Sequence, residues 1–160
     1  IRAFKILVDS GLALNLVLGG KKDPEYPEIP ALIHELGLEK EIIMTDFLSE
    51  PDLIALFSGA EVFVFPSLSE GFGLPPLEAM ALGVPVACSN ITSLPEICGN
   101  AAQYFNPLDP KDMAKNLKNL IESQDLRQKL ILKGQANLAL FSFQRMALET
   151  LDIYKNIDII

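Results

Sequence analysis

The sequence predicts an α/β fold, with a Rossmann-like parallel sheet of about five strands and helices on both faces. Two patterns carry this prediction. Short apolar runs alternate with amphipathic stretches through residue 105, and glycine or proline separates many of them. The run at residues 62–65, VFVF, is continuously apolar, which is typical of a strand that is buried on both faces. Connections between such parallel strands are expected to be right-handed crossovers.

The expected elements follow one another with short connections. Strands are predicted at residues 14–18, 41–44, 62–65, 84–88 and 103–105. Helices are predicted at residues 1–10, 28–36, 51–58, 75–82, 93–99, 110–123, 125–139 and 142–156. The polar, proline-rich stretch at residues 21–30 is expected to be a loop.

Local signals mark where several of these helices begin and end. Ser49 with Asp52, and Ser93 with Glu96, have the spacing of a helix capping box. Asp109 is positioned to cap the helix that starts at the following proline. Glycines at positions 11, 37, 83 and 99 are suitable stops at helix C-termini.

Length and composition limit what the chain can be. At 160 residues it fits one domain, residues 1–160, and 49% apolar residues are ample for a core. The net charge of −8 argues against nucleic acid or an anionic membrane as a partner of this segment. No apolar run approaches the roughly 18 residues expected of a transmembrane helix. The chain opens at Ile1 without an initiator methionine, which favours a fragment or a trimmed chain.

Cysteine and histidine content restricts the chemistry. Cys88 and Cys98 are the only cysteines, and their spacing fits no metal or redox motif. Their apolar neighbours favour reduced core thiols and a cytoplasmic protein. His34, the only histidine, falls in a predicted helix, so Ser-His-Asp catalysis and a histidine metal site are both improbable.

The stretch that points to a function is the junction at residues 61–85, where a strand, a glycine loop and a helix follow in succession. A helix N-terminus leaves backbone N–H groups unpaired and favours anions such as phosphate. Gly71 and Gly73 allow a ligand to approach the backbone closely. Glu70 and Glu78 flank the loop, and carboxylates are good acceptors for sugar hydroxyls. This combination suits a nucleotide-sugar, although a helix-stabilising Glu78 and a solvated Glu70 would fit the same residues.

The same junction resembles a known family. Glu70 and Glu78 reproduce the E-x7-E motif of retaining glycosyltransferases of family 4, also called group 1. The run PSLSEGFGLPPLEAMALGVPVACSN is similar to the signature of that family. Similarity continues through LNLVLGG, SLPEICGNAAQYFNPLDP and FSFQRMALETLDIYKNI, over nearly the whole chain. The resemblance implies the C-terminal, donor-binding lobe of a two-lobed (GT-B) enzyme.

This resemblance assigns expected roles to the loop and its flanking residues. Glu78 would accept hydrogen bonds from the ribose hydroxyls, and Glu70 would lie near the reacting centre as the catalytic residue. Backbone N–H groups of the loop would bind the sugar and the β-phosphate, through Gly71, Phe72, Gly73 and Leu74. The loop with Thr45 and Phe47 would cradle the nucleobase, although Asp46 replaces the usual glycine of the family.

The implied reaction is transfer of a sugar, with retention, from a GDP- or UDP-linked donor to an unknown acceptor, without a metal ion or other cofactor. The acceptor would bind an absent N-terminal lobe. The family's first strand of this lobe is also expected before residue 1, between the strands at 14 and 62, together with a basic pair. Without these parts the fragment alone is expected to be inactive. The full enzyme is expected to be cytoplasmic, with peripheral membrane association left open.

Three alternatives remain open from the sequence. Another GT-B enzyme, such as a sugar synthase or an epimerase, would share the architecture. A non-catalytic or regulatory nucleotide-sugar-binding lobe would also keep the two glutamates. A dinucleotide-binding domain fits less well, because no G-x-G-x-x-G follows the first strand.

Overall fold

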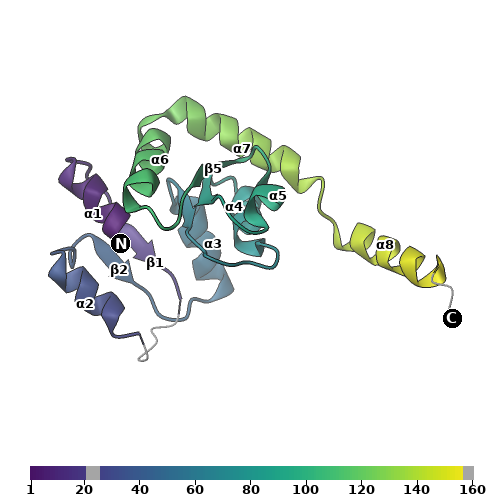
Figure 1. Cartoon of the computed structure of the whole chain (residues 1–160), viewed down its shortest axis with the longest axis horizontal. Coiled ribbons are helices and arrows are strands. Elements are labelled where there is room, and N and C mark those ends of the chain that lie inside the picture. The colour runs from purple at the N-terminus through teal and green to yellow at the C-terminus, as the bar shows by residue number, and fades with distance from the viewer. Residues whose placement is uncertain (21–25, 157–160) are drawn as a thin grey trace.

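The computed structural model describes residues 1–20 and 26–156. Residues 21–25 of the loop predicted at 21–30 therefore lie outside the described residues, and the described part of that loop begins at Tyr26. Helices and strands alternate through the first two thirds of the chain (Figure 1). The strands are β1 (Leu16–Leu18), β2 (Ile42–Met44), β3 (Phe63–Phe65), β4 (Val86–Ser89) and β5 (Ala102–Phe105). The helices are α1 (Arg2–Asp9), α2 (Glu28–Glu35), α3 (Glu50–Gly59), α4 (Leu74–Ala81), α5 (Leu94–Cys98), α6 (Pro110–Glu122), α7 (Gln124–Leu138) and α8 (Phe143–Asn156).

All strand pairs are parallel, as the sequence predicts. β1 pairs with β2, and β4 lies between β3 and β5. The strands therefore form two hydrogen-bonded groups rather than the single sheet that was expected. Within residues 1–20 and 26–156, no backbone pairing joins β1 to β3. This is the position at which the resemblance implies a further strand, and that implication stays a prediction.

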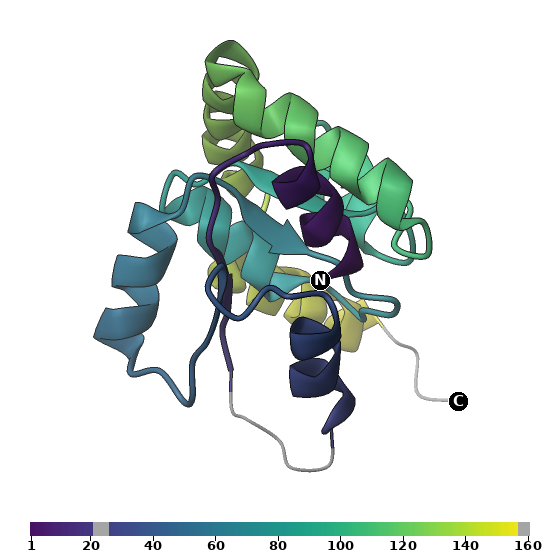
Figure 2. The same cartoon turned by 90° about the vertical axis from the view of Figure 1, so that its left-hand side faces the viewer.

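The three-stranded group is covered on both faces. One face packs against α4 and α5 through a cluster that includes Val86, Cys88 and Leu94. The other face packs against α1 and α6 through Ala87 and Phe105. Figure 2 shows α3 to one side of the strands and α1 with α2 to the other. The alternation of residues along β4 explains this arrangement, because neighbouring side chains of a strand point to opposite faces.

The two-stranded group is covered on one face only. Leu16, Leu18 and Ile42 pack with α1 and α2 in a separate apolar cluster. Val17 and Ile43 point the other way, and 38% and 52% of their surfaces are exposed. The β1–β2 group is therefore half covered in the described part of the chain.

The C-terminal helix α8 extends away from the body of the molecule (Figure 1). None of its residues is buried, and Phe143, Met146 and Tyr154 are all exposed large apolar side chains. No helix in the described residues is long and apolar enough to cross a membrane.

Most predicted element boundaries agree with the structure to within two residues. Ser49 caps α3 by accepting a hydrogen bond from the backbone of Asp52, and Asp109 caps α6 in the same way. Cys88 and Cys98 are buried free thiols, as predicted. One capping prediction is wrong: Ser93 precedes α5, but its hydroxyl makes no capping hydrogen bond.

Candidate functional site

The glycine loop, which we define as residues 70–73, joins β3 to α4 at the carboxyl end of the strands. Ligands of open parallel sheets bind at this end. Gly73 has a φ of +110°, and a Cβ placed there would lie 2.8 Å from Cδ2 of Leu94. Because Leu94 is completely buried, that methyl group has no room to move aside. Glycine is therefore required at 73 both by the backbone and by the close approach of α5.

The start of α4 differs slightly from the prediction. The helix begins at Leu74, with Gly73 as its N-cap, so Glu78 is its fifth residue rather than about its third. Pro75 and Pro76 occupy the first turn and carry no N–H. The unpaired backbone donors at this end are consequently concentrated in the glycine loop and Leu74.

The hydroxyl of Ser93 is bonded to the glycine loop instead of to its own helix. It lies 3.1 Å from the carbonyl oxygen of Glu70 and 2.9 Å from that of Phe72. This contact spans more than 20 residues of sequence, and it explains why the local capping pattern failed. Ser93 also has helical backbone angles, φ −76° and ψ −18°, rather than the extended conformation that a capping residue adopts.

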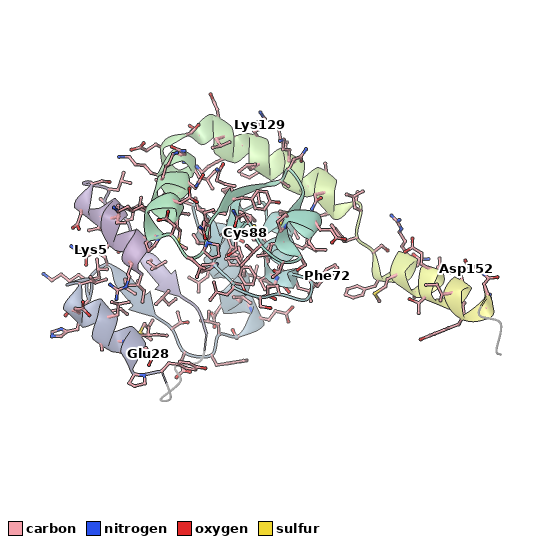
Figure 3. All side chains as sticks on the ribbon, viewed as in Figure 1. Lys5, Glu28, Phe72, Cys88, Lys129 and Asp152 are labelled. Carbon is pink, nitrogen blue, oxygen red and sulfur yellow. The ribbon has the colours of Figure 1, made fainter. Side chains whose placement is uncertain are left out.

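An aromatic contact covers one side of the glycine loop. The ring of Phe72 meets the ring of Phe141 edge to face, with centroids 5.8 Å apart. Phe141 follows α7 and precedes α8, so the connection between these helices borders the loop. Figure 3 shows Phe72 at the margin of the body, whereas Cys88 lies inside it. The Phe72 ring therefore packs on one side, although 44% of the surface of Phe72 is exposed.

The two glutamates of the motif have carboxylates available for a ligand. Glu78 is exposed and Glu70 is half-buried. Among the described residues, neither carboxylate takes part in an ion pair or a side-chain hydrogen bond. Both groups therefore keep their full capacity to accept hydrogen bonds.

Thr45 and Phe47, the residues expected near a nucleobase, lie at the carboxyl end of β2. The Thr45 hydroxyl accepts from the N–H of Gly20 at 3.2 Å and lies 3.3 Å from the carbonyl of Leu18, so it ties the ends of β1 and β2 together. The Phe47 ring is largely exposed. No hydrogen bond in the described part of the chain joins this turn to the glycine loop, so the structure does not link the two groups of predicted site residues.

Two further features lie next to β4. Ser89, the last residue of β4, is fully buried, and its hydroxyl has no hydrogen-bond partner among the described residues. Thr92 is the one non-glycine residue of the described chain with a positive φ, at 56°. Strained residues of this kind gather at functional sites. The sequence places both residues in the segment 89–93 at the carboxyl ends of the strands, although it assigns neither of them a role of its own.

One hollow on the surface lies away from the glycine loop. It has a volume of about 540 Å³ and lies between α1, α2 and the start of α6, lined by Arg2, Lys5, Leu36 and Lys111 among others. The glycine loop instead lies on an open edge. An open edge is expected where the walls of a cleft come from another part of a molecule.

The thiols beneath the loop do not serve as nucleophiles. A hydrogen bond with Cys98, together with burial, raises the pKa of Cys88. The same hydrogen bond lowers the pKa of Cys98, against the effect of burial. Because both sulfur atoms are completely buried in the core below β4, neither has access to a ligand.

These features define a class before any relative is considered: a parallel α/β domain with a glycine loop and two free carboxylates at the carboxyl edge of its sheet. The sequence model of "Glycosyl transferases group 1" matches residues 1–137. The chain therefore belongs to the group 1 glycosyltransferase family, and the resemblance read from the sequence is confirmed.

Two curated relatives match most of the chain. The chain is 42% identical over 134 residues to the serotype-specific mannosyltransferase WbdA of Escherichia coli, covering 82% of this chain and 16% of the relative. It is 33% identical over 156 residues to the O-antigen chain mannosyltransferase B of Escherichia coli, covering 97% and 41%. The chain thus spans well under half the length of these relatives.

Solved structures share the fold. Sucrose-phosphate synthase from Thermosynechococcus elongatus superimposes with a TM-score of 0.84 at 25% identity, covering 96% of this chain and 41% of that one. HepE from Anabaena, solved in complex with UDP, gives a TM-score of 0.83 at 18% identity, covering 98% and 45%. These likenesses confirm the predicted α/β lobe of the GT-B type.

The comparisons leave several predictions untested. The roles of Glu70, Glu78, the glycine loop, Thr45 and Phe47 stay predictions, and so does the absence of a metal ion from the reaction. The division of the whole protein into lobes is likewise a prediction.

Proposed function

We propose that this chain is the donor-binding lobe of a retaining glycosyltransferase that uses a GDP- or UDP-linked sugar. Family membership and the free carboxylates of Glu70 and Glu78 support the proposal together. The observation that carries it is the glycine loop at the start of α4, with Glu70 at its first position and Glu78 in the helix, neither carboxylate being paired within the described residues. Phosphate groups bind favourably to the backbone N–H groups of such a loop, and sugar hydroxyls donate hydrogen bonds to carboxylates.

Mannose is the proposed donor sugar. The curated relatives named above are mannosyltransferases, and one of them is 42% identical over 134 residues. A related MMP alpha-(1->4)-mannosyltransferase from Mycolicibacterium hassiacum is 34% identical over 155 residues, covering 94% of this chain and 37% of the relative. The base stays open between guanine and uracil in this proposal, because HepE, a relative in fold, binds UDP.

Each site residue has a proposed part in the reaction. Glu78 accepts hydrogen bonds from the ribose, and Glu70 lies beside the anomeric carbon. Backbone N–H groups of residues 71–74 bind the sugar and the β-phosphate, and stabilise charge on the leaving diphosphate without a metal ion. Thr45 and Phe47 border the base.

The rest of the enzyme supplies what this lobe lacks. We propose that the acceptor binds an N-terminal lobe, which closes the cleft over the open edge, and that this chain alone is inactive. Clefts between domains are common ligand sites. Reduced buried thiols are consistent with the cytoplasmic location included in the proposal. Association of the whole enzyme with a membrane surface would reside in that other lobe.

The test is an NMR titration of this chain with UDP, GDP, their mannose and glucose conjugates, and NAD. Glu78→Gln is expected to weaken binding of the preferred ligand by about ten- to a hundred-fold, because hydrogen bonds to a charged acceptor are lost. Glu35→Gln, an exposed acid on α2, removes the same charge and should leave the affinity unchanged. Shifts should cluster at residues 70–78.

Preference for NAD, or equal binding by wild type and Glu78→Gln, would contradict the proposal. The nucleotide that binds more tightly, UDP or GDP, identifies the base of the donor. Binding without any transfer, when the whole enzyme is supplied with acceptor extracts, would instead favour the regulatory lobe.

A further inference from the structure

We propose that Ser93 is a positioning residue for donor binding: its hydroxyl holds the glycine loop so that the loop's N–H groups face the ligand. This inference rests on the proposed function. It concerns a side chain that the sequence places either in a helix cap or along the donor pocket, and the structure contradicts the cap.

The first step is the choice of acceptors. The Ser93 hydroxyl lies within hydrogen-bond distance of the carbonyl oxygens of Glu70 and Phe72, at 3.1 and 2.9 Å. It carries one proton, so the two carbonyls share or alternate in accepting it. They are separated along the chain by a single residue, Gly71. The Ser93 hydroxyl, the tether of the loop, therefore holds the backbone on both sides of Gly71, the residue with the widest choice of conformations.

The second step follows from peptide geometry. In a trans peptide the C=O of one residue and the N–H of the next are fixed in one plane and point in opposite directions. The described chain contains no cis peptide bond. With the carbonyls of Glu70 and Phe72 directed at Ser93, the N–H groups of Gly71 and Gly73 are directed away from α5. Ser93 thus sets the orientation of two donors that it does not touch.

The third step is the need for a tether. A Cβ built at Gly71 meets no atom within 4 Å, so local packing does not restrain this residue. Glycine also has the widest choice of backbone conformations, and an unrestrained loop would lose that freedom on binding. A loop fixed beforehand avoids this cost and binds more tightly.

The other supports of the loop do not replace the tether. Leu94 restrains Gly73 from below, and Phe141 contacts the ring of Phe72. Both are van der Waals contacts of a side chain, and neither fixes the direction of the peptide groups at residues 70–72. Only the Ser93 hydroxyl, among the described contacts, bonds to those units directly.

The test compares two variants of nearly equal shape, Ser93→Thr and Ser93→Val. Threonine keeps the hydroxyl and valine replaces it with a methyl group, so differences in packing largely cancel. The dissociation constant for the preferred nucleotide-sugar is expected to be near wild type for Ser93→Thr and about three- to tenfold higher for Ser93→Val. The NMR order parameters of the backbone N–H groups at residues 71–74 in the unliganded chain should be lower in Ser93→Val alone.

Ser123→Ala is the control for general destabilisation. Ser123 caps α7 by accepting from the backbone of Leu126, and it has no contact with the glycine loop. This variant should lower the melting temperature without changing the donor affinity or the order parameters at residues 71–74. Ser93→Ala, which removes the hydroxyl without adding a methyl group, serves if the valine variant does not fold.

Two outcomes separate this inference from the function on which it rests. Binding by wild type with equal affinity for Ser93→Thr and Ser93→Val would overturn the positioning role alone. A wild-type chain that binds no nucleotide-sugar, even when extended by its N-terminal lobe, would overturn the proposed function and the positioning role together.

Discussion

The two strand groups of this molecule differ in how they are covered. The β3–β4–β5 group has helices on both faces, and Val86, Ala87 and Cys88 are completely buried. The β1–β2 group has an apolar cluster on one face and exposed Val17 and Ile43 on the other. Both groups use the same parallel pairing and similar side chains. The difference therefore lies in what packs against each strand, not in the strands themselves.

This difference bears on where a precise site can be built. A side chain or loop is held accurately only when its support is packed on every side. The glycine loop stands on the fully covered group and is bordered by Leu94 and Ser93 of the adjacent segment. The Thr45 turn stands on the half-covered group, and its neighbour Phe47 is largely exposed. We expect substitutions in the first group to have the larger effects.

The largest expected effect is in the core of the covered group. Leu94→Ala removes a side chain that is 0% exposed and should lower the free energy of unfolding by about 2–5 kcal/mol. Val17→Ala, on the outer face of β1 with 38% exposure, should cost only about 1 kcal/mol. Urea denaturation of both variants measures the two values. Equal losses would show that the coverage of the two groups does not differ in energy.

An intermediate effect is expected within the glycine loop. Gly73→Ala imposes a side chain at a φ of +110° and against the buried Leu94, and should cost about 1–3 kcal/mol. Donor binding should weaken in parallel, because the N–H at this position moves.

Gly71→Ala is the matched control for that variant. A Cβ at residue 71 enters open space, so stability should stay within about 1 kcal/mol of wild type. Thermal melting of the pair checks the contrast, and a Gly73→Ala variant as stable as Gly71→Ala would argue against the tight fit between loop and α5.

The smallest effect sharpens the comparison within one strand. Ile42 and Ile43 are neighbours in β2, with 7% and 52% of their surfaces exposed. Ile42→Val should cost about 0.5–1.5 kcal/mol through the loss of a buried methyl group. Ile43→Val should change the free energy of unfolding by less than about 0.5 kcal/mol.

The same denaturation experiment measures both variants, so their difference is independent of the extrapolation to water. A cost for Ile43→Val equal to that for Ile42→Val would indicate that the outer face of β2 is covered in solution, for example by a second copy of the chain.

The sequence predicts the elements of this fold well because their signals are local. Runs of β-branched and aromatic residues such as 62–65 favour a strand, although Phe63–Phe65 is half-buried rather than buried. Glycines such as Gly37 end helices by their own conformation. The family motif also places Glu70, the glycine loop and Glu78 correctly at a strand–helix junction.

Features that depend on distant residues could not be predicted in this way. The pairing of β3 with β4 begins at Phe63 and Val86, which moves β4 two residues beyond its expected start at residue 84. The separation of the strands into two groups is a property of the whole sheet. The contact of Ser93 with Glu70 spans 23 residues, and its S-x-x-E pattern indicates a local cap instead. Phe141 has no signal at all that links it to Phe72.

The contacts around the glycine loop also determine when it can form. Its tether, Ser93, is reached only after β4 has been added to β3, and its aromatic neighbour, Phe141, lies beyond α7. Contacts between residues far apart in the chain form late, since the intervening chain must first be ordered. During synthesis the loop is therefore present in the chain well before these contacts can fix its conformation. The binding edge can be completed only when the chain has been made beyond residue 141, because Leu138 and Phe141 also pack against the core beneath it.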